Sequence, residues 1–435
     1  MNKVRYVKFE NLYLENSRNG VSKPSRIRGE GFPMVNMKEI FAYDIISNQQ
    51  MERVPLTKVE YENNLLKVND LLFARQSLIA EGAGKVSIID NLNEETTFES
   101  HLIRVRLDEK VVDPKFYYYY FRSPQGKGNT QSIVMQVAAA GIRGSDLAKL
   151  KVPLISLSKQ KKIASALSAY DDLIENNNQR ISILEEMAEG IYKEWFVRLR
   201  FNSYQNTVFF DNIGNEVPFG TKGAIPEGWE QTQLKSHIEY FRGKSYSSAE
   251  LRENEGLAML NLKNIKKQGG FRRDGLKYFE GKYNPNNEAY TGDIIMAVTD
   301  MTQEREIVGR VARVPDMGID KFIISMDLVR IEPIKLPKLF TYCFFRFSGI
   351  GFQLKEFANG ANVLHLTPSL IEFQKAIIPD IKICESFENI VEPMITEIDV
   401  LNNKNQILQE TRDLLLPRLI SGKLSVENLE VEEMN

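Results

Sequence analysis

A long apolar repeat with coiled-coil spacing restricts the fold of this chain more than any other feature. From Ser158 to Trp195 the sequence reads SKQKKIASALSAYDDLIENNNQRISILEEMAEGIYKEW, without proline and with one late glycine. Apolar positions recur at alternating steps of four and three residues, which keeps one face of a helix against a partner helix. These positions are Ile163, Leu167, Tyr170, Ile174, Asn177, Ile181, Leu184, Ala188, Ile191 and Trp195.

The length of this stretch favours a coiled coil over the alternative, a long core helix of a single domain. A helix of this size is roughly 57 Å long at ~1.5 Å per residue, more than one compact domain needs. Ser156 or Ser158 can cap its start. Asn177 interrupts the apolar face, and such a polar residue costs stability but fixes register. We therefore expect Asn177→Leu to stabilise the helix pair and to loosen its pairing specificity.

A second stretch, from Ile383 to Leu419, has the same character. Its apolar face is marked by Phe387, Ile390, Met394, Ile398, Leu401, Leu408, Leu415 and Leu419, with Asn405 and Arg412 as polar breaks. Pro393 is expected to kink this helix or to mark its effective start, and Pro417 to act similarly near its end. Gly422 is a plausible stop. Two such helices predict an antiparallel pair that separates two globular units.

Composition sets broad limits on the class of protein. The N-terminus has no apolar region typical of a signal peptide, and no window resembles a membrane span. The only cysteines, Cys343 and Cys384, provide no disulfide framework and fit a reducing compartment. The formal net charge is only −2, but a basic stretch between Lys235 and Lys282 contrasts with the acidic helix before it. This distribution fits two polyanion-binding parts joined by acidic helices, or simply solvated faces.

The chain contains an internal repeat. GFPMVNMKEI from Gly31 matches GLAMLNLKNI from Gly256, VNDLLFARQ from Val68 matches TGDIIMAVT from Thr291, and LIRV from Leu102 matches LVRI. The matches keep their order, which predicts two copies of one unit, a globular domain followed by a helix. The fold class expected is α+β (mixed α/β), with a curved sheet in each copy. The expected boundaries are 1–155 and 229–381 for the globular domains, 156–198 and 382–424 for the helices, 199–228 for a linker and 425–435 for an acidic tail.

Motifs for catalysis are missing from the sequence. The run Gly82-Ala83-Gly84-Lys85 lacks the spacing and terminal Lys-Ser/Thr pair of a phosphate loop, so it is interpreted as a turn between strands. No Asn/Asp-Pro-Pro-aromatic tetrad and no Ser/His/Asp or Cys/His arrangement is present. The three histidines are far apart, which argues against a metal site. The consecutive tyrosines from Tyr117 to Tyr120 are interpreted as helix packing rather than base stacking.

Loop chemistry instead suggests recognition of DNA. Arginine and lysine can read guanine, asparagine and glutamine can read adenine, and basic or hydroxyl side chains bind phosphate. The first copy offers Lys23, Arg26, Arg28, Lys38, Arg75, Gln76, Ser77 and Arg143. The second offers Arg242, Lys244, Ser245, Tyr246, Lys263, Asn264, Lys266, Lys267, Arg272, Arg273, Thr299 and Arg305. For each residue alone, a solvent-exposed charge without a base contact is the alternative.

Three further motifs make the chain resemble the DNA-specificity subunits of type I restriction-modification systems. They are LEEMAEGIYKEWFVRLRF at the end of the first helix, IPEGWE at the start of the second domain, and LLLPRLISGKL at the end of the second helix. The first copy departs from the family pattern because it starts without an IPEGW-like opening.

The resemblance implies a non-catalytic cytoplasmic subunit that binds double-stranded DNA and has no membrane association. Each recognition domain would read one half of a bipartite asymmetric site. Two methyltransferase subunits, which carry S-adenosylmethionine, and two restriction subunits, which use ATP and Mg, would be its partners, and the chain itself would hold no cofactor. The alternatives are a coiled-coil adaptor that binds only proteins, and a fused nuclease or methyltransferase, which the absent motifs disfavour.

Overall fold

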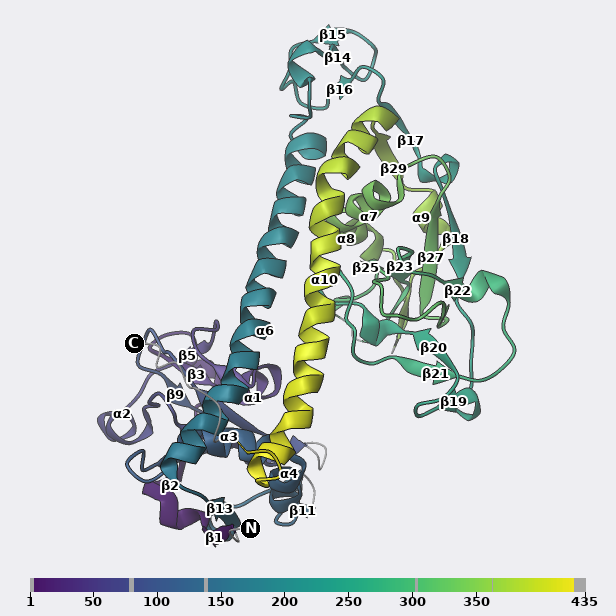
Figure 1. Cartoon of the computed structure of the whole chain (residues 1–435). Helices are drawn as coiled ribbons and strands as arrows, with labels where there is room; N and C mark the ends of the chain where they lie inside the picture. The colour runs from purple at the N-terminus through teal and green to yellow at the C-terminus, as the bar shows by residue number, and fades with distance from the viewer. Residues whose placement is uncertain (1–3, 78–81, 137–139, 302–303, 362, 426–435) are drawn as a thin grey trace. The chain divides into compact units, whose positions relative to one another are not determined.

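The computed structural model describes residues 4–77, 82–136, 140–301, 304–361 and 363–425 (Figure 1). The chain divides into two compact units. Unit 1 comprises Met1–Glu175 and Asn405–Asn435, and unit 2 comprises Asn176–Lys404. Each unit combines helices with β-sheets, so the chain has a mixed α+β fold.

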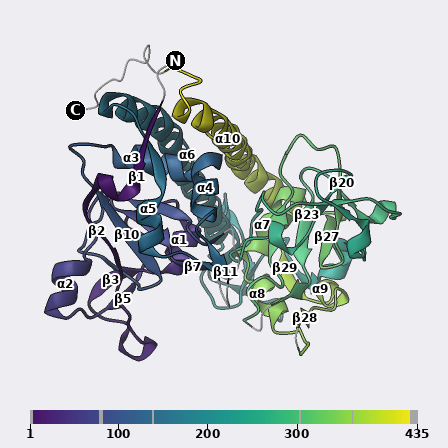
Figure 2. The same cartoon turned by 90° about the horizontal axis from the view of Figure 1, so that it is seen from below.

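Unit 1 is built on a five-stranded sheet with the order β2-β10-β6-β8-β4. Figure 2 shows β2 and β10 side by side. Leu71 and Phe73 of the central strand β6 enter one apolar cluster, while Leu72 and Ala74 enter another, so both faces of this strand are buried. The strands are β2 (Tyr13–Asn19), β4 (Ile45–Ile46), β6 (Leu71–Ala74), β8 (Val86–Ile89) and β10 (Leu102–Leu107).

Smaller sheets and helices surround this sheet in unit 1. The additional strands are β1 (Arg5–Lys8), β3 (Phe32–Val35), β5 (Glu52–Val54), β7 (Gln76–Ser77), β9 (Thr97–Phe98), β11 (Met135–Gln136), β12 (Ala140–Gly141) and β13 (Lys151–Leu154). The short helices are α1 (Met37–Ala42), α2 (Lys58–Asn64), α3 (Pro114–Arg122), α4 (Pro124–Gln131) and α5 (Gly144–Lys149).

The tyrosine run lies on α3, in the main core of unit 1. Tyr117, Tyr118, Tyr119 and Tyr120 are all buried. The Tyr117 hydroxyl donates to the Pro153 carbonyl at 2.8 Å, which connects α3 to β13. The prediction that these residues pack a helix rather than stack on bases is confirmed, because their rings have no solvent-accessible face.

Unit 2 contains a four-stranded sheet of order β18-β27-β23-β25 and a five-stranded sheet of order β19-β21-β20-β26-β22. The first sheet is formed by β18 (Ile238–Arg242), β23 (Ile294–Ala297), β25 (Val311–Arg313) and β27 (Leu328–Pro333). The second is formed by β19 (Leu251–Arg252), β20 (Leu257–Leu260), β21 (Lys277–Phe279), β22 (Glu288–Ala289) and β26 (Phe322–Ile324). Helix α7 (Lys338–Phe347) contributes aromatic side chains to the main core.

The remaining elements of unit 2 are short. They are β17 (Glu230–Gln233), which pairs with β29 (Lys375–Ile378), β24 (Thr299–Asp300), which pairs with β28 (Leu364–His365), and the helices α8 (Ile350–Lys355) and α9 (Ser369–Glu372). The segment 199–228 is more structured than its composition indicates. It contains a small sheet of β14 (Phe209–Phe210), β15 (Glu216–Val217) and β16 (Ile225–Pro226).

Two long helices contribute to both units. Helix α6 (Leu157–Tyr192) continues into a π-helical turn, Lys193–Val197, and α10 spans Ile381–Ile420. Within unit 1, Ile163 and Leu167 of α6 share an apolar cluster with residues Leu416, Leu419 and Ile420 of α10. Within unit 2, Ile181 of α6 clusters with Ile398 and Leu401 of α10. Helix α10 ends before Gly422, which adopts φ +72°, as the sequence predicted.

The structure corrects two expectations for α10. The helix begins at Ile381, so Pro393 does not mark its start. Ile390, expected in the apolar seam, is 42% exposed, and Val391 is buried in its place. The seam therefore follows Phe387, Val391 and Met394, a sequence that keeps the four-three spacing while Ile390 faces away.

Candidate nucleic-acid interface

The end of the central strand β6 in unit 1 gathers four polar side chains. The Arg75 backbone N–H donates to the His101 carbonyl at 2.8 Å, and the Arg75 guanidinium lies 3.4 Å from the Ser100 carbonyl. Gln76 Oε1 and His101 Nδ1 are 2.8 Å apart. Arg143 follows β12, whose backbone pairs with β7. Gln76, His101 and Arg143 are exposed, so this edge presents several hydrogen-bonding groups to solvent.

His101 was not singled out by sequence reasoning. It lies 25 residues after Gln76 in the chain, and only the sheet brings the two together. The repeat offers a faint signal, because His101 directly precedes the LIRV match, but a lone histidine has no spacing pattern that predicts a partner. Ser77 of the predicted set lies beside this pair on β7.

The other predicted residues of the first copy differ in their availability. The Lys23 ammonium pairs with Glu60 at 2.7 Å and its side chain is largely buried. Burial raises the pKa of Glu60, but hydrogen bonds from Lys23 and Thr57 outweigh burial and hold that pKa below its usual value. Arg28 pairs with Glu52, at 2.7 Å. Lys23 and Arg28 therefore hold local structure, whereas Arg26 and Lys38 are exposed.

A pocket of about 760 Å³ lies close to this edge. Its cationic lining residues are Lys85, Arg122 and Lys127, and Asp44 is the carboxylate among them. Burial raises the pKa of Asp44, but the charges of Arg122 and Lys85 outweigh burial and hold that pKa below its ordinary range. The Gly82–Lys85 run forms a turn closed by a Lys85 N–H to Gly82 carbonyl bond of 3.3 Å, which confirms its interpretation as a turn.

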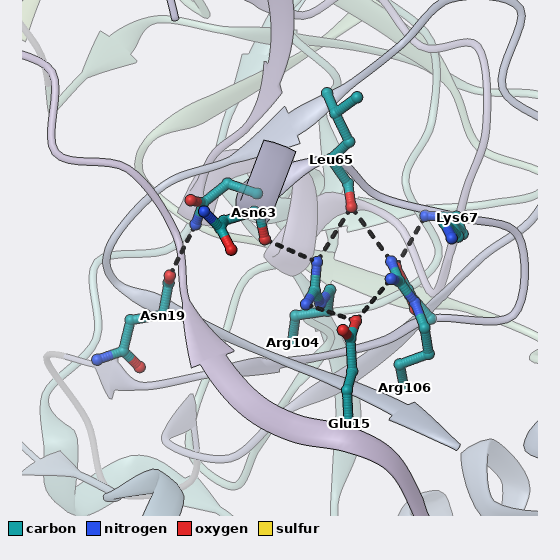
Figure 3. Close-up of polar contacts among 9 residues, drawn as sticks. Glu15, Asn19, Asn63, Leu65, Lys67, Arg104 and Arg106 are labelled. Carbon is teal, nitrogen blue, oxygen red and sulfur yellow. Dashed lines mark hydrogen bonds and ion pairs between the residues drawn. The ribbon is translucent and has the colours of Figure 1, made fainter. Parts of the chain in front are cut away.

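Two arginines on β10 bind carboxylates and backbone carbonyls of unit 1 (Figure 3). Arg104 is buried and donates to Glu15 at 2.8 Å and to backbone carbonyls at the end of α2. Arg106 donates to both carboxylate oxygens of Asp70 at 2.7 Å and to Glu15 at 2.6 Å. Burial and the neighbouring Arg106 lower the pKa of Arg104. These arginines tie β2, α2 and the turn before β6 together, so they serve the fold rather than a ligand.

In unit 2, the stretch after β18 carries three of the predicted residues, Lys244, Ser245 and Tyr246. The Lys244 N–H donates to the Ile324 carbonyl at 2.7 Å, which fixes this stretch to β26. The Tyr246 hydroxyl accepts a 2.6 Å hydrogen bond from Lys277. Arg242 and Ser245 are exposed.

The predicted residues after β20 differ in their exposure and in the contacts that they make. Lys263 and Lys266 are exposed, and Lys267 pairs with Glu306. Asn264 is fully buried, and its amide donates to the Arg272 carbonyl at 3.1 Å. Its expected base contact is therefore corrected to a structural role, because the neighbouring turn already uses its donor.

Four predicted residues of unit 2 contact other residues of the same unit. Arg272 pairs with Asp274, and Arg273 donates to Asn403 of α10 at 2.6 Å. The Arg305 guanidinium pairs with Glu356, at the C-terminal end of α8, at 3.1 Å. Thr299 is buried, with its hydroxyl 3.5 Å from His365 Nδ1, so its expected contact with DNA is also corrected.

The described residues contain no group of three or more His, Cys, Asp or Glu side chains that could hold a metal ion. Among the same residues, none of the helices combines the length and apolar character needed to cross a membrane. The two cysteines are buried and free.

Comparison with known proteins shows which class of protein the chain is similar to. Residues 21–186 match the family described as "Type I restriction modification DNA specificity domain". The chain is 27% identical over 421 residues to the specificity subunit of the type I restriction enzyme MjaIX of Methanocaldococcus jannaschii, covering 92% of this chain and 88% of that protein. A putative MjaX specificity subunit from the same organism is 24% identical over 429 residues, covering 95% and 92%.

A solved structure shares the fold. The crystal structure of the type I restriction-modification S subunit from M. genitalium aligns with a TM-score of 0.53 and 15% identity, over 96% of this chain and 97% of that one. The chain is thus similar over most of its length to type I restriction enzyme specificity subunits, and its first part matches a type I DNA specificity domain.

Proposed function

We propose that this chain reads DNA sequence for a type I restriction-modification complex, and that units 1 and 2 are copies of one recognition domain. Each copy reads one half of a bipartite, asymmetric site. The observation that carries this proposal is the shared internal construction of the two units. The specificity-subunit family supplies the DNA-recognition role, and the chain itself performs no catalysis.

A buried aspartate at the start of the central strand supports the repeat. In unit 1, Asp70 accepts the Lys67 N–H at 2.8 Å and pairs with an arginine of the neighbouring strand β10. In unit 2, Asp293 accepts the Tyr290 N–H, also at 2.8 Å, and lies 3.8 Å from an arginine of the neighbouring strand β27. The same residue type caps the same turn and faces the same strand in each unit.

A close backbone approach supports it further. The Val21 N–H donates to the Phe98 carbonyl at 2.8 Å, and the Lys244 N–H donates to the Ile324 carbonyl at 2.7 Å. The residue before each donor is a glycine, and a Cβ there would lie 2.0 Å from an oxygen of unit 1 or 1.9 Å from one of unit 2. Both sites require glycine for the same reason, because only a residue without Cβ permits this approach.

The domain limits proposed here are those that the sequence predicts. The recognition domains extend over 1–155 and 229–381, the long helices over 156–198 and 382–424, the linker over 199–228 and the acidic tail over 425–435. The helices form an antiparallel coiled coil that sets the distance between half-sites. The interface residues predicted for it, apart from Ile390, are Ile163, Leu167, Tyr170, Ile174, Asn177, Ile181, Leu184, Ile191, Met394, Leu401, Leu408 and Leu415.

The partners proposed are those of the family. Two methyltransferase subunits dock on this chain and carry S-adenosylmethionine, and two restriction subunits supply ATP- and Mg-dependent translocation and cleavage. The most accessible DNA-contacting candidates are the exposed ones. They are Arg26, Lys38, Gln76 and Arg143 in the first domain, and Arg242, Ser245, Lys263 and Lys266 in the second.

Methylation mapping tests this function. The chain is expressed with the methyltransferase subunit encoded beside it, and adenine methylation of the host DNA is mapped. A single bipartite motif with a fixed gap, lost when this chain is deleted, is the expected result. Gln76→Ala with Arg143→Gln should alter one half-site only, and Arg242→Gln with Lys263→Gln should alter the other. A motif that stays unchanged when this chain is deleted would reject the proposal.

A further inference from the structure

A glycine turn and a following cation occupy the same place in both units. Gly84 has φ +80° and donates to the Ala74 carbonyl, and Gly309 has φ +79° and donates to the Ala297 carbonyl, each at 2.8 Å. The next residues, Lys85 and Arg310, directly precede the strands β8 and β25, and their carbonyls accept N–H bonds from the ends of β6 and β23. The two cations are therefore equivalent positions at the end of the central strand.

Each of these cations lies over an exposed phenylalanine ring. The Lys85 ammonium is 5.9 Å from the centre of the Phe41 ring, which is 43% exposed. The Arg310 guanidinium is 3.8 Å from the centre of the Phe352 ring, which is 54% exposed. The Lys355 ammonium is a second cation over Phe352, at 5.3 Å.

The two rings come from different elements. Phe41 belongs to α1, between β3 and β4, whereas Phe352 belongs to α8, which follows β27 and α7. If the ring were only a core residue inherited from a common ancestor of the two units, the same element would supply it in both. Because different helices supply the ring in the two units, the recurrence of the pair indicates that a cation with an aromatic ring is needed at this position. Both rings are too exposed for core packing to explain them.

In each unit, the glycine turn with its cation lies beside the strands proposed to contact DNA. In unit 1, a Cβ on Gly82 would be 2.2 Å from the Ser77 hydroxyl, so the turn touches β7. In unit 2, Asp300 of β24 accepts the Ile307 N–H at 2.7 Å, which fixes the same turn to the strand that pairs with β28. In unit 1, the Lys85 ammonium also lies 3.5 Å from the Asp44 carboxylate and donates to the Phe41 carbonyl at 3.1 Å, so part of its charge is already neutralised. Arg310 and Lys355, which lie over Phe352, form no ion pair with a carboxylate within the described residues, so their charges are available to an anion.

We propose that Lys85 with Phe41, and Arg310 with Phe352, are nucleotide-contacting pairs, one in each recognition domain. The cation neutralises a DNA phosphate while the exposed ring packs on the sugar and base of the same strand. An aromatic face is tolerant of base identity, and a cation above it is suited to a phosphate rather than to a base edge. The inference rests on the proposed DNA-binding function and adds a contact that binds DNA without distinguishing its sequence.

The salt dependence of DNA binding distinguishes the contribution of the ring from that of the positive charge. The full chain is purified with its methyltransferase subunit, and binding to a 40-bp duplex carrying the mapped motif is measured by fluorescence anisotropy at several salt concentrations. Phe352→Ala and Phe41→Ala should each weaken binding about tenfold with an unchanged salt slope, because stacking involves no counterion release. Arg310→Gln should weaken binding and reduce the slope by about one, and Lys85→Gln, whose charge Asp44 partly neutralises, should reduce it by less.

Phe373 provides a matched control. It is 49% exposed and lies 5.9 Å from the Lys235 ammonium, yet it follows α9, away from the glycine turn. Phe373→Ala should bind as the wild type does, and Phe352→Tyr, which keeps the ring face, should retain binding. Wild-type binding together with unchanged binding by both ring variants would overturn this inference alone. Failure of the wild-type complex to bind the mapped duplex would remove the proposed function with it.

Discussion

The Arg412 guanidinium on α10 donates to the Asp171 carboxylate on α6, and both side chains are almost completely buried, with 11% and 9% of their surfaces exposed. The Tyr119 hydroxyl on α3 donates to the other oxygen of Asp171 at 2.6 Å. All three residues lie in unit 1. This triad connects the two long helices to the core of the unit through one carboxylate.

Removing Arg412 should destabilise the protein strongly. Arg412→Met leaves Asp171 buried without its cation, and breaking a buried ion pair in this way typically costs about 3–5 kcal/mol. The free energy of unfolding from urea titration measures the effect. The matched control is Arg180→Met, which removes an exposed ion pair between the same two helices, with Glu397 at 2.8 Å, and should cost less than about 1 kcal/mol.

The double replacement Asp171→Leu with Arg412→Leu decides whether the cost comes from the isolated charge. Apolar side chains of similar volume often restore the stability lost when one partner of a buried pair is removed. We expect the double variant to be more stable than Arg412→Met. A double variant as unstable as the single one would show that packing by Arg412, rather than the unpaired carboxylate, dominates.

The helices were the most predictable part of the fold, because helical periodicity depends on local sequence alone. The four-three spacing located both α6 and α10, but it treated Arg412 as a break in the seam. Its partner Asp171 is 241 residues away, and no local pattern connects them. The error at Ile390 has a similar origin: an apolar residue stands beside Val391, and only the packing shows which of the two faces the core.

The candidate site was less predictable than the fold. A loop rich in polar residues signals recognition, but it does not tell which side chains the fold itself uses. Asn264 and Thr299 have the chemistry of DNA contacts and are buried, whereas His101 carries no motif and is exposed beside Gln76. The internal repeat aligned the segments that contain Asp70 and Asp293, but it did not single out either aspartate.

Asp44 should make stability depend on acid pH. Its pKa is held below the ordinary value by Arg122 and Lys85, so its ionised form stabilises the folded state above that ordinary value, and this contribution is lost as pH falls through the lowered pKa. Free energies of unfolding at pH 6 and pH 3 measure this. The gap between the wild type and Asp44→Asn should be large at pH 6 and narrow at pH 3. Glu10→Gln, which removes an exposed pair with Lys8, is the control; an equal gap for Asp44→Asn at both pH values would contradict the assignment.

The two thiols should report the unfolding of unit 2. Cys343 and Cys384 are buried, and burial raises the pKa of Cys343 to about 12 and that of Cys384 further. Since the thiolate is the reactive form, a disulfide reagent at pH 8 should label neither residue in the native protein and both in denaturant. Ser248→Cys, at an exposed position, should add one rapidly reacting thiol. Fast native labelling of the wild type would mean that the core around α7 opens readily.

The proposed spacing role of the helices predicts the effect of lengthening them. Inserting one heptad into α6 after Asn178 and one into α10 after Asn403 preserves the seam and lengthens each helix by about 10 Å. Because base pairs are spaced by about 3.4 Å, the gap between half-sites should grow by roughly three base pairs while both half-sites stay unchanged. Methylation mapping of the variant complex measures this. Inserting seven residues at the exposed Gly214 turn lengthens the chain without lengthening a helix and should leave the gap as it is. An unchanged gap in the helix variant, with methylation retained, would show that α6 and α10 do not set the distance between half-sites.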